Sequence, residues 1–581
     1  MSTSRVEEEI LNQLEWEKAL QHITWLVNEA PGRHSGTEDE KKAANYIQET
    51  LSHYGLSVET YETDAYSGVP QDARLKIVEP TMQTIKCSPR APTRSPISGE
   101  ILCIESKEEA KEKYKDIEGK IVMVPSLVSY GLPITPEGVR QKGGRGFIHG
   151  NWGGKEHGAL RVSAYQTQTY WGVPRLEEFE RKEKEMLPQI YITRKDFEYL
   201  KTLCKKGTVK ATFESRISSE WRKVHLVVAE VEGMDTVKDF AFIGGHFDSW
   251  FPGATDNAAG DALLMELARV FQNNRKHLRR NIRIGFWSGH ESACYAASTW
   301  YLDHFWTEID RHAVAYSAVD NPGFKDAPEY SVQVSEEIGD FVIGCARDVV
   351  GDNAILNVRR PSKTCDRGFF GIGLPSIYVY NAFSSRQLDE WHGAHLGWFN
   401  HSPYDTIDKI GEDNFVKTMR IRALVELRLC NCDVLPFDFI KVVGAFKKRL
   451  EEWERVAPRF DLGDTGTYVS RLDKKLQDLH ETLESREFGE GDLRQVNTLL
   501  MKLCRTLIPI NFTTAGRYSQ DIFGTDLSKP LVAFKDIDEL AFLRKGSPEE
   551  SMLMAKLFKE KNRVNDGLIQ GVSLIDAFLE K

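Results

Sequence analysis

The stretch DFAFIGGHFDSWFPGATDNAAG, residues 239–260, decides the fold of this chain. It opens on a short apolar run typical of a buried strand. It then passes through a turn rich in glycine and proline and leads into a helical pattern over residues 258–272. Two further strand-like runs, residues 281–288 and 312–320, follow, with a helical segment near residues 295–306 between them. Strands that alternate with helices in this way predict an α/β sheet with parallel strands.

The composition argues against several classes of protein. The chain has 581 residues, of which 41% are hydrophobic and 28% charged, and a formal net charge of −10. This length predicts three or four domains, and the acidic balance argues against a nucleic-acid partner, which needs a basic surface. No apolar run reaches the roughly 18 residues of a membrane helix. The nine cysteines contain no CxxC pair. We therefore expect a cytoplasmic protein with reduced thiols and no membrane partner.

The texture of the sequence changes three times and predicts four segments. Residues 5–28 read as one amphipathic helix, and Thr37 with Glu40 forms a capping box at the start of the next helix. Short strand-like runs split by glycine and proline follow, then the α/β pattern, then long helical stripes and a short helical tail. The predicted segments are an N-terminal part of the core (1–70), a β-rich insert (71–215), the α/β core (216–411) and a helical domain (412–581). Helices are expected within the last segment near 412–432, 438–456, 466–484 and 491–507.

Side chains that bind metal ions follow the predicted parallel strands. The carboxyl ends of such strands are where open α/β sheets place their sites. A hydrolytic metal centre needs His nitrogens and carboxylate oxygens, with one coordination position left for water. Asp256 lies beyond a glycine-rich turn that can fold back to the same strand end, so it is the best candidate for a carboxylate that bridges two ions. Asp248 suits a carboxylate that orients a liganding imidazole. The candidate side chains are His246, Asp248, Asp256, His290, Glu291, Asp320 and, much later, His401.

At this point the sequence resembles the co-catalytic zinc aminopeptidases, a superfamily that includes glutamate carboxypeptidase and the transferrin receptor. The resemblance is carried by an ordered series of motifs that covers nearly the whole chain. These motifs are GRHSGTEDEKKAANYI (32–47), GGRGFIHGNWGG (143–154), GGHFDSWFPGATDNAAG (244–260), DRGFFGIGLPS (366–376) and HSPYDTIDKI (401–410).

The resemblance implies a fold, a cofactor and an assembly. It implies a mostly parallel mixed sheet flanked by helices, with an inserted β-rich protease-associated domain and a C-terminal helical dimerisation domain. The expected cofactor is a divalent metal, most simply zinc, at one or two ions per chain. One ion would be held by His246, Asp256 and Asp320, and the other by Asp256, a Glu and His401. The expected assembly is a homodimer or a larger homo-oligomer.

The segment WSGHESACYAAS, residues 287–298, departs from the family pattern, which has a Glu-Glu pair at this place. Aligned from its start, His290 takes the position of the general base and Glu291 that of a metal ligand. We favour this alignment because it keeps all five ligands and gives the proton to a group with a pKa near 6.5. Aligned from its end, Glu291 becomes the base and Ser292 replaces the ligand. The site would then hold one ion, or His290 would itself bind metal.

Two functions from different classes fit these observations. The first is a metal-dependent, aminopeptidase-like hydrolase of an amide-type bond in a small peptide or a non-peptide amide. Its catalytic residues would be His290 and Asp248, and Asn400 would donate a hydrogen bond to the substrate carbonyl. The second is a non-catalytic binding scaffold similar to the transferrin receptor. Because the ligand positions survive here, we expect the enzyme.

Overall fold

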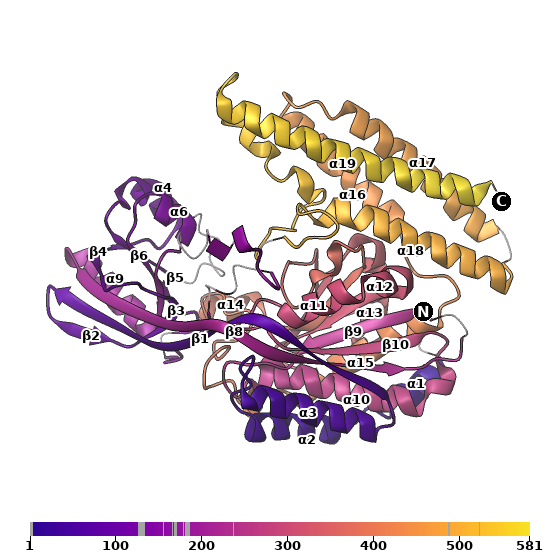
Figure 1. The fold of residues 1–581 in the computed structure, drawn as a ribbon, viewed down its shortest axis with the longest axis horizontal. Helices are drawn as coiled ribbons and strands as arrows, with labels where there is room; N and C mark the ends of the chain where they lie inside the picture. The colour runs from indigo at the N-terminus through magenta and orange to yellow at the C-terminus, as the bar shows by residue number, and fades with distance from the viewer. Residues whose placement is uncertain are drawn as a thin grey trace.

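A central sheet carries the α/β core (Figure 1). The computed structural model describes residues 4–125, 134–154, 156–164, 167, 171–177, 179–180, 186–235, 238–485, 488–521 and 523–580. Strands β14, β11, β9 and β10 are parallel neighbours, whereas β12 and β8 join them in antiparallel fashion. The order across the core is β13 (Leu356–Arg359), β12 (Glu329–Val334), β14 (Ser376–Ala382), β11 (Ala313–Val319), β9 (Phe240–His246), β10 (Asn281–Trp287) and β8 (Lys210–Val231). The predicted mostly parallel mixed sheet is therefore confirmed.

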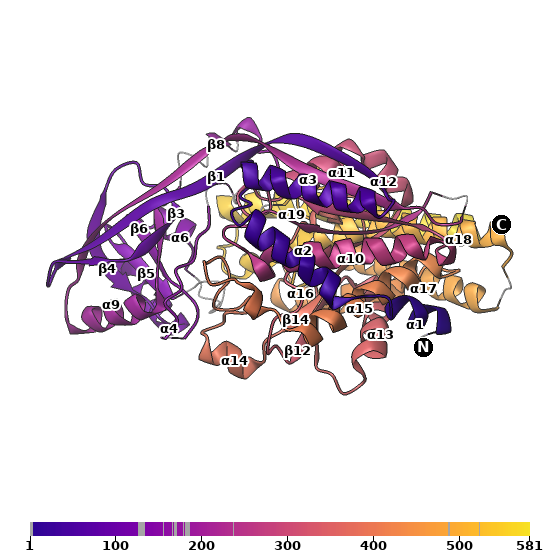
Figure 2. The same cartoon turned by 90° about the horizontal axis from the view of Figure 1, so that it is seen from below.

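Helices cover both faces of this sheet (Figures 1 and 2). Every residue of β9 and β11 is buried, which explains why these strands read as continuous apolar runs rather than as alternating ones. One face carries α2 (Trp16–Glu29), α3 (Glu38–His53), α10 (Ala259–Asn273), α13 (Gly339–Val350) and α15 (Glu412–Asn431). The other carries α11 (Ala296–His304) and α12 (Trp306–His312), so the helix predicted near residues 295–306 is interrupted at Phe305.

A long two-stranded ribbon joins the core to the β-rich insert (Figure 1). Strands β1 (Ser57–Glu79) and β8 pair along nearly their whole length and continue past residues 70 and 215, with a register shift between Pro70 and Ala73. The described residues of the insert also include the helices α4 (Lys107–Lys113), α6 (Pro136–Gln141) and α9 (Arg194–Lys206). Its short strands are β2 (Gln83–Ile85), β3 (Cys87–Ala91), β4 (Ile97–Cys103), β5 (Ile121–Pro125), β6 (Gly146–Gly150) and β7 (Gln189–Ile192).

Helices dominate the chain after the core, and they pack beyond α11 and α12 (Figure 1). They are α16 (Phe439–Val456), α17 (Gly463–Ser485), α18 (Glu490–Phe512) and α19 (Pro548–Leu579). The expectation of a short helical tail is wrong, because α19 has 32 residues. Two glycines weaken its helical signal, yet Gly567 and Gly571 let α19 approach Ile510 of α18 and Leu472 of α17 closely. None of the described helices combines the length and apolar character that a membrane crossing requires.

The N-terminal helix predicted over residues 5–28 is two helices, α1 (Arg5–Leu11) and α2. The helix is interrupted where residues of the connecting segment form hydrogen bonds to the core rather than within the helix. The side-chain amides of Gln13 and Asn274 exchange hydrogen bonds, and the backbone N–H of Glu15 donates to Glu266 at 2.7 Å. The bond from the Glu15 backbone replaces a helical one, and a periodicity argument does not detect such a long-range contact.

The capping box predicted at the start of α3 is only half formed. The Thr37 hydroxyl accepts the backbone N–H of Glu40, as expected. The Glu40 side chain turns away from the helix and binds the backbone N–H and the ring of His225, both at 2.8 Å. Tertiary packing thus captures the carboxylate that would otherwise close the box.

Candidate metal centre

The predicted side chains come from neighbouring strand ends. His246 is the last residue of β9, His290 and Glu291 follow β10, and Asp320 follows β11. Cross-strand pairing sets Trp287 beside His246 and Val319 beside Gly245, so the three strands end at one level. The predicted position at the carboxyl edge of the parallel strands therefore matches the structure.

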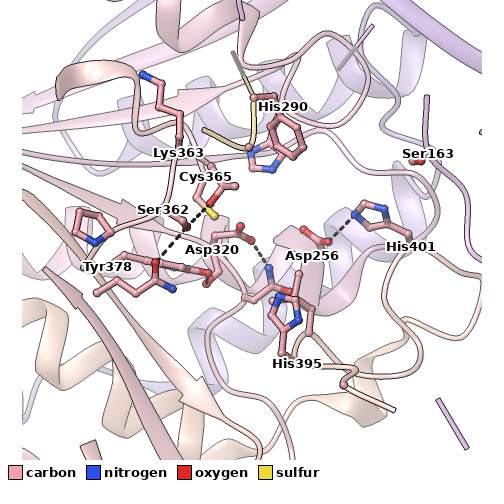
Figure 3. A pocket seen from close by; sticks show the side chains of 18 of the residues that line it. Ser163, Asp256, His290, Asp320, Ser362, Lys363, Cys365, Tyr378, His395 and His401 are labelled. Atoms are coloured by element: carbon pink, nitrogen blue, oxygen red, sulfur yellow. Dashed lines mark hydrogen bonds and ion pairs between the residues drawn. The ribbon is translucent and has the colours of Figure 1, made fainter. Parts of the chain in front are cut away.

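Two imidazoles and three carboxylates converge at this edge, and Figure 3 labels three of them, His401, Asp256 and Asp320. His246 Nε2 lies 3.3 Å from an oxygen of Asp256 and 3.5 Å from one of Asp320. His401 Nε2 lies 3.2 Å from the other Asp256 oxygen and 3.1 Å from Glu291. Asp256 thus faces both imidazoles with different oxygens, which is the geometry expected of a bridging carboxylate.

The turn Ala254–Ala258 presents Asp256, and a buried carboxylate holds this turn. Asp405 accepts hydrogen bonds from the backbone N–H and hydroxyl of Thr255, both at 2.9 Å, and from the backbone N–H of Asp256 at 3.2 Å. The Asn257 amide donates to the carbonyls of His246 and Val319, and so ties the turn to β9 and β11. Burial raises the pKa of Asp405 to about 7.

Asp248 contacts both the segment after β10 and the imidazole of His246. Its carboxylate accepts the backbone N–H groups of His290 at 3.2 Å and Glu291 at 3.0 Å, and the Ser35 hydroxyl at 2.7 Å. The nearest oxygen to His246 Nδ1 is the Asp248 carbonyl at 3.0 Å, with the carboxylate at 3.6 Å. The expected role in orienting the imidazole is therefore shared between the backbone and the side chain of Asp248.

The His290 ring is held on three sides. Its Nδ1 lies 2.7 Å from a carboxylate oxygen of Asp366, its face stacks on His246 at 3.6 Å between ring centroids, and Tyr295 contacts it edge-on. The other Asp366 oxygen accepts the Ser298 hydroxyl at 2.5 Å. Sequence reasoning did not single out Asp366, although it lies in a quoted motif, because nothing local connects it to His290.

The two alignments of this segment place different groups at the centre. Under the first, Glu291 is a ligand, and its carboxylate does lie beside His401. Under the second, Ser292 takes that place, but its hydroxyl bonds Ser67 of β1 at 2.9 Å. The Glu291 carboxylate, and not Ser292, thus lies beside His401, whereas His290 lies with His246 and Asp320 in a group that could itself hold a metal ion.

The insert supports His401 from the opposite side. His401 Nδ1 lies 3.1 Å from the Val162 carbonyl, and the Val162 N–H donates to the His401 carbonyl at 3.1 Å. Asn400 does not point a free amide at a substrate: it donates to Asp256 at 2.5 Å and accepts from Arg161 at 2.7 Å. Arg161 is a second neighbour of the centre that sequence reasoning missed.

The electrostatics of the cluster couple its imidazoles to its carboxylates. Burial acts to lower the pKa of His246, but the neighbouring carboxylates of Asp248, Asp256 and Asp320 raise it well above the usual range. For Asp256, burial acts in the opposite sense, yet the neighbouring imidazoles of His246 and His401 hold its pKa well below the usual range. Positive charge is therefore strongly favoured between these side chains.

The cluster opens into a cavity of about 1100 Å³. Three parts of the chain line it: the insert, the core, and the segment Phe523–Ser528 between α18 and α19. Figure 3 shows Asp256, Asp320, His290 and His401 around one space in its wall. Residues from far apart in the sequence thus build a single concave site.

Comparison with known proteins shows which family the core of this chain resembles. Residues 227–425 match the model of peptidase family M28, so the superfamily resemblance is confirmed for the core. A probable glutamate carboxypeptidase of Arabidopsis thaliana is 25% identical over 306 residues, covering 49% of this chain and 44% of the relative. The aminopeptidase NAALADL1 of Mus musculus is 31% identical over 351 residues, covering 54% and 47%.

The comparison with solved structures shows the fold. A zinc aminopeptidase from Bacillus subtilis has a TM-score of 0.52 at 17% identity, covering 71% of this chain and 94% of that one. This chain spans 36 to 62% of the length of the curated relatives first matched. The comparison therefore applies to the shared core of the molecule.

The donor set fits a divalent metal ion. His246 Nε2 is buried and has no hydrogen-bond partner among the described residues. Ligand atoms bound to one tetrahedral ion at about 2.0–2.1 Å lie about 3.3 Å apart, close to the separations of 3.1 to 3.5 Å measured here. Imidazole and carboxylate are also the mixed donors that zinc takes in hydrolytic sites.

Proposed function

We propose that this protein is a metal-dependent hydrolase of an amide-type bond, and that its substrate is a short peptide or a small non-peptide amide. The observation that carries the proposal is the convergence of two imidazoles and three carboxylates on one cavity wall. The family match and the fold support a peptidase-like hydrolase of this kind.

The side chains divide the work. His246, Asp256 and Asp320 would hold one zinc ion, and Asp256, Glu291 and His401 a second. When bound, such ions polarise the scissile carbonyl and make water more acidic.

His290 accepts the proton from water and returns it to the leaving nitrogen, with Glu291 as the alternative acceptor. Because Asp366 engages Nδ1, it leaves His290 Nε2 as the acceptor and stabilises the imidazolium that forms. Asp248 keeps His290 and Glu291 in place through their backbone N–H groups.

Metal analysis combined with a substrate panel tests the proposal. Purified protein should contain one or two equivalents of zinc or another divalent ion, and should hydrolyse a member of a panel of aminoacyl anilides and aryl amides. His290→Ala should abolish most turnover while keeping the metal, whereas His304→Ala, an exposed residue of α11, should leave both unchanged. Absence of metal, with no loss of stability on chelation, would support the non-catalytic scaffold instead.

The remaining expectations stay predictions. The insert 71–215 as a protease-associated domain, the segment 412–581 as a dimerisation domain, the homodimer and the cytoplasmic location are tested by none of these comparisons. Exposed apolar side chains in the C-terminal helical segment support an interface there: Phe542 is 88% and Met552 66% exposed. Measurement of the molar mass in solution checks the dimer.

A further inference from the structure

Trp250 holds one of the two carboxylate oxygens of Glu291. Its indole N–H donates to Glu291 Oε2 at 2.8 Å, while Glu291 Oε1 lies 3.1 Å from His401 Nε2. The Glu291 side chain is 3% exposed, so water has little access to either oxygen. An indole nitrogen can only donate a hydrogen bond. The two oxygens of this carboxylate therefore face different partners, one the indole and the other the imidazole.

Aromatic neighbours and the backbone fix the Trp250 ring. The centroid of the His34 ring lies 4.8 Å and that of the His401 ring 6.2 Å from it. The preceding residue is held as well, because the Ser249 N–H donates to the Arg33 carbonyl at 2.9 Å. The direction of the indole N–H is thus set before any ion binds.

Trp250 connects the two halves of the proposed metal centre. It lies in the loop after β9, the strand that ends at His246, whereas Glu291 follows β10. His246 belongs to the first proposed ion and Glu291 to the second. The indole thus ties a ligand of one ion to the loop that follows a ligand of the other. Groups that orient a metal ligand in this way influence metal affinity strongly.

The number of oxygens that Glu291 offers decides how many positions remain at the second ion. A carboxylate binds a metal ion through one oxygen or through both. One oxygen each from Asp256 and Glu291 and one nitrogen from His401 fill three positions of a four-coordinate zinc ion, and hydrolytic zinc sites leave the fourth for water. Both oxygens of Glu291 would fill that position too. The oxygen that accepts the indole N–H is directed away from this role.

We infer that Trp250 is a positioning residue, which fixes Glu291 as a one-oxygen ligand of the ion that it shares with Asp256 and His401. The inference rests on the proposed function, because it concerns the metal centre of that function. A purely structural role would need only the ring, which packs near His34 and His401. The positioning role needs the N–H group as well, so a substitution that removes this group alone separates the two roles.

Metal titration of the full-length protein tests this. Trp250→Phe keeps an aromatic ring but has no N–H donor, and Trp250→Met, which also lacks the donor, takes its place if the first variant does not fold. The matched control is Trp221→Phe in β8, where Trp221 is 51% exposed. Competition with a chromophoric chelator measures zinc affinity, and the visible spectrum of the cobalt-substituted protein reports changes among the ligand atoms. Urea unfolding of the metal-free protein checks that each variant is folded.

Wild type and Trp221→Phe should bind two zinc ions with the same pair of affinities. Trp250→Phe should bind one of the two ions about 10–100-fold more weakly, the loss typical when a group that orients a ligand is removed. The other ion should keep nearly its wild-type affinity. The cobalt spectrum of Trp250→Phe should differ from that of wild type, because the second oxygen of Glu291 is then free to bind.

Equal affinities of Trp250→Phe and wild type for both ions would overturn the inference, as would identical cobalt spectra. A loss that falls equally on both ions, or that Trp221→Phe shows as well, would also overturn it and leave Trp250 a packing role. Binding of a single ion by wild type would overturn the inference and leave the proposed function standing. Binding of no ion by wild type would overturn the proposed function, and the inference with it.

Discussion

Replacing Arg33 by methionine should destabilise the protein strongly, and the structure sets the size of the effect. The Arg33 side chain is fully buried and donates to five backbone carbonyls: those of Leu26, Ala30, Phe247, Pro252 and Gly253, at 2.8 to 3.3 Å. Two of these carbonyls, Leu26 and Gly253, also accept a backbone N–H and keep that bond. Loss of the donor to the other three, at about 1–2 kcal/mol each, predicts a destabilisation of about 3–6 kcal/mol.

Urea denaturation of the zinc-loaded and metal-free protein measures this loss. Arg33→Lys serves as the matched variant, because it keeps the charge but has fewer donors, and it should lose less stability than Arg33→Met. The variant should also bind zinc more weakly, since Arg33 secures residues 247–253, the loop that carries Asp248. A change below about 1 kcal/mol in both states would refute the reasoning, because it would mean that water or local rearrangement satisfies the carbonyls.

Three further outcomes follow from the described contacts. Asp366→Asn should keep the metal but lower turnover about 10²–10⁴-fold, because His290 loses the carboxylate that fixes its ring; metal analysis and steady-state kinetics check this. Burial raises the pKa of Glu337 from its usual 4.5 to about 7, so the folded state holds that proton longer than the unfolded chain. Glu337 should contribute a fall in stability of about 3 kcal/mol between pH 4.5 and 7, and Glu337→Gln should remove that part of the pH dependence in denaturation curves at pH 5 and 8. Burial acts to lower the pKa of His401, but Glu291 raises it to about 9, so zinc must displace a proton from this imidazole. Zinc affinity should therefore rise about tenfold per pH unit up to pH 9. A zinc affinity that does not change with pH would contradict this.

Much of the core was predictable because its signals are local. Local sequence patterns predict β9, β11 and the glycine-rich turn after His246, because the two strands are continuous apolar runs. The position of the ligands at the strand ends follows from the parallel topology. The four helices after residue 411 had clear apolar stripes. The long helix α19 was underestimated because its two glycines serve packing rather than helix formation.

The residues that were missed depend on tertiary contacts. Asp366 reaches His290 only because Cys365 and Asp366 adopt left-handed backbone conformations, with φ of 57° and 53°. Arg161 reaches His401 from an insert whose path over the core leaves no periodic trace in the sequence. The same holds for Glu40, whose bond to His225 broke the predicted capping box.

The ribbon of β1 and β8 has a mechanical consequence for the cavity. A module tethered by flexible linkers can move freely, but here two hydrogen-bonded strands continue from one body into the other, with one register shift between Pro70 and Ala73 at the boundary. Separating the two strands would break the hydrogen bonds between them. The insert should therefore keep a fixed position over the cavity. Entry to the cavity would then depend on how well a molecule fits an opening of constant shape.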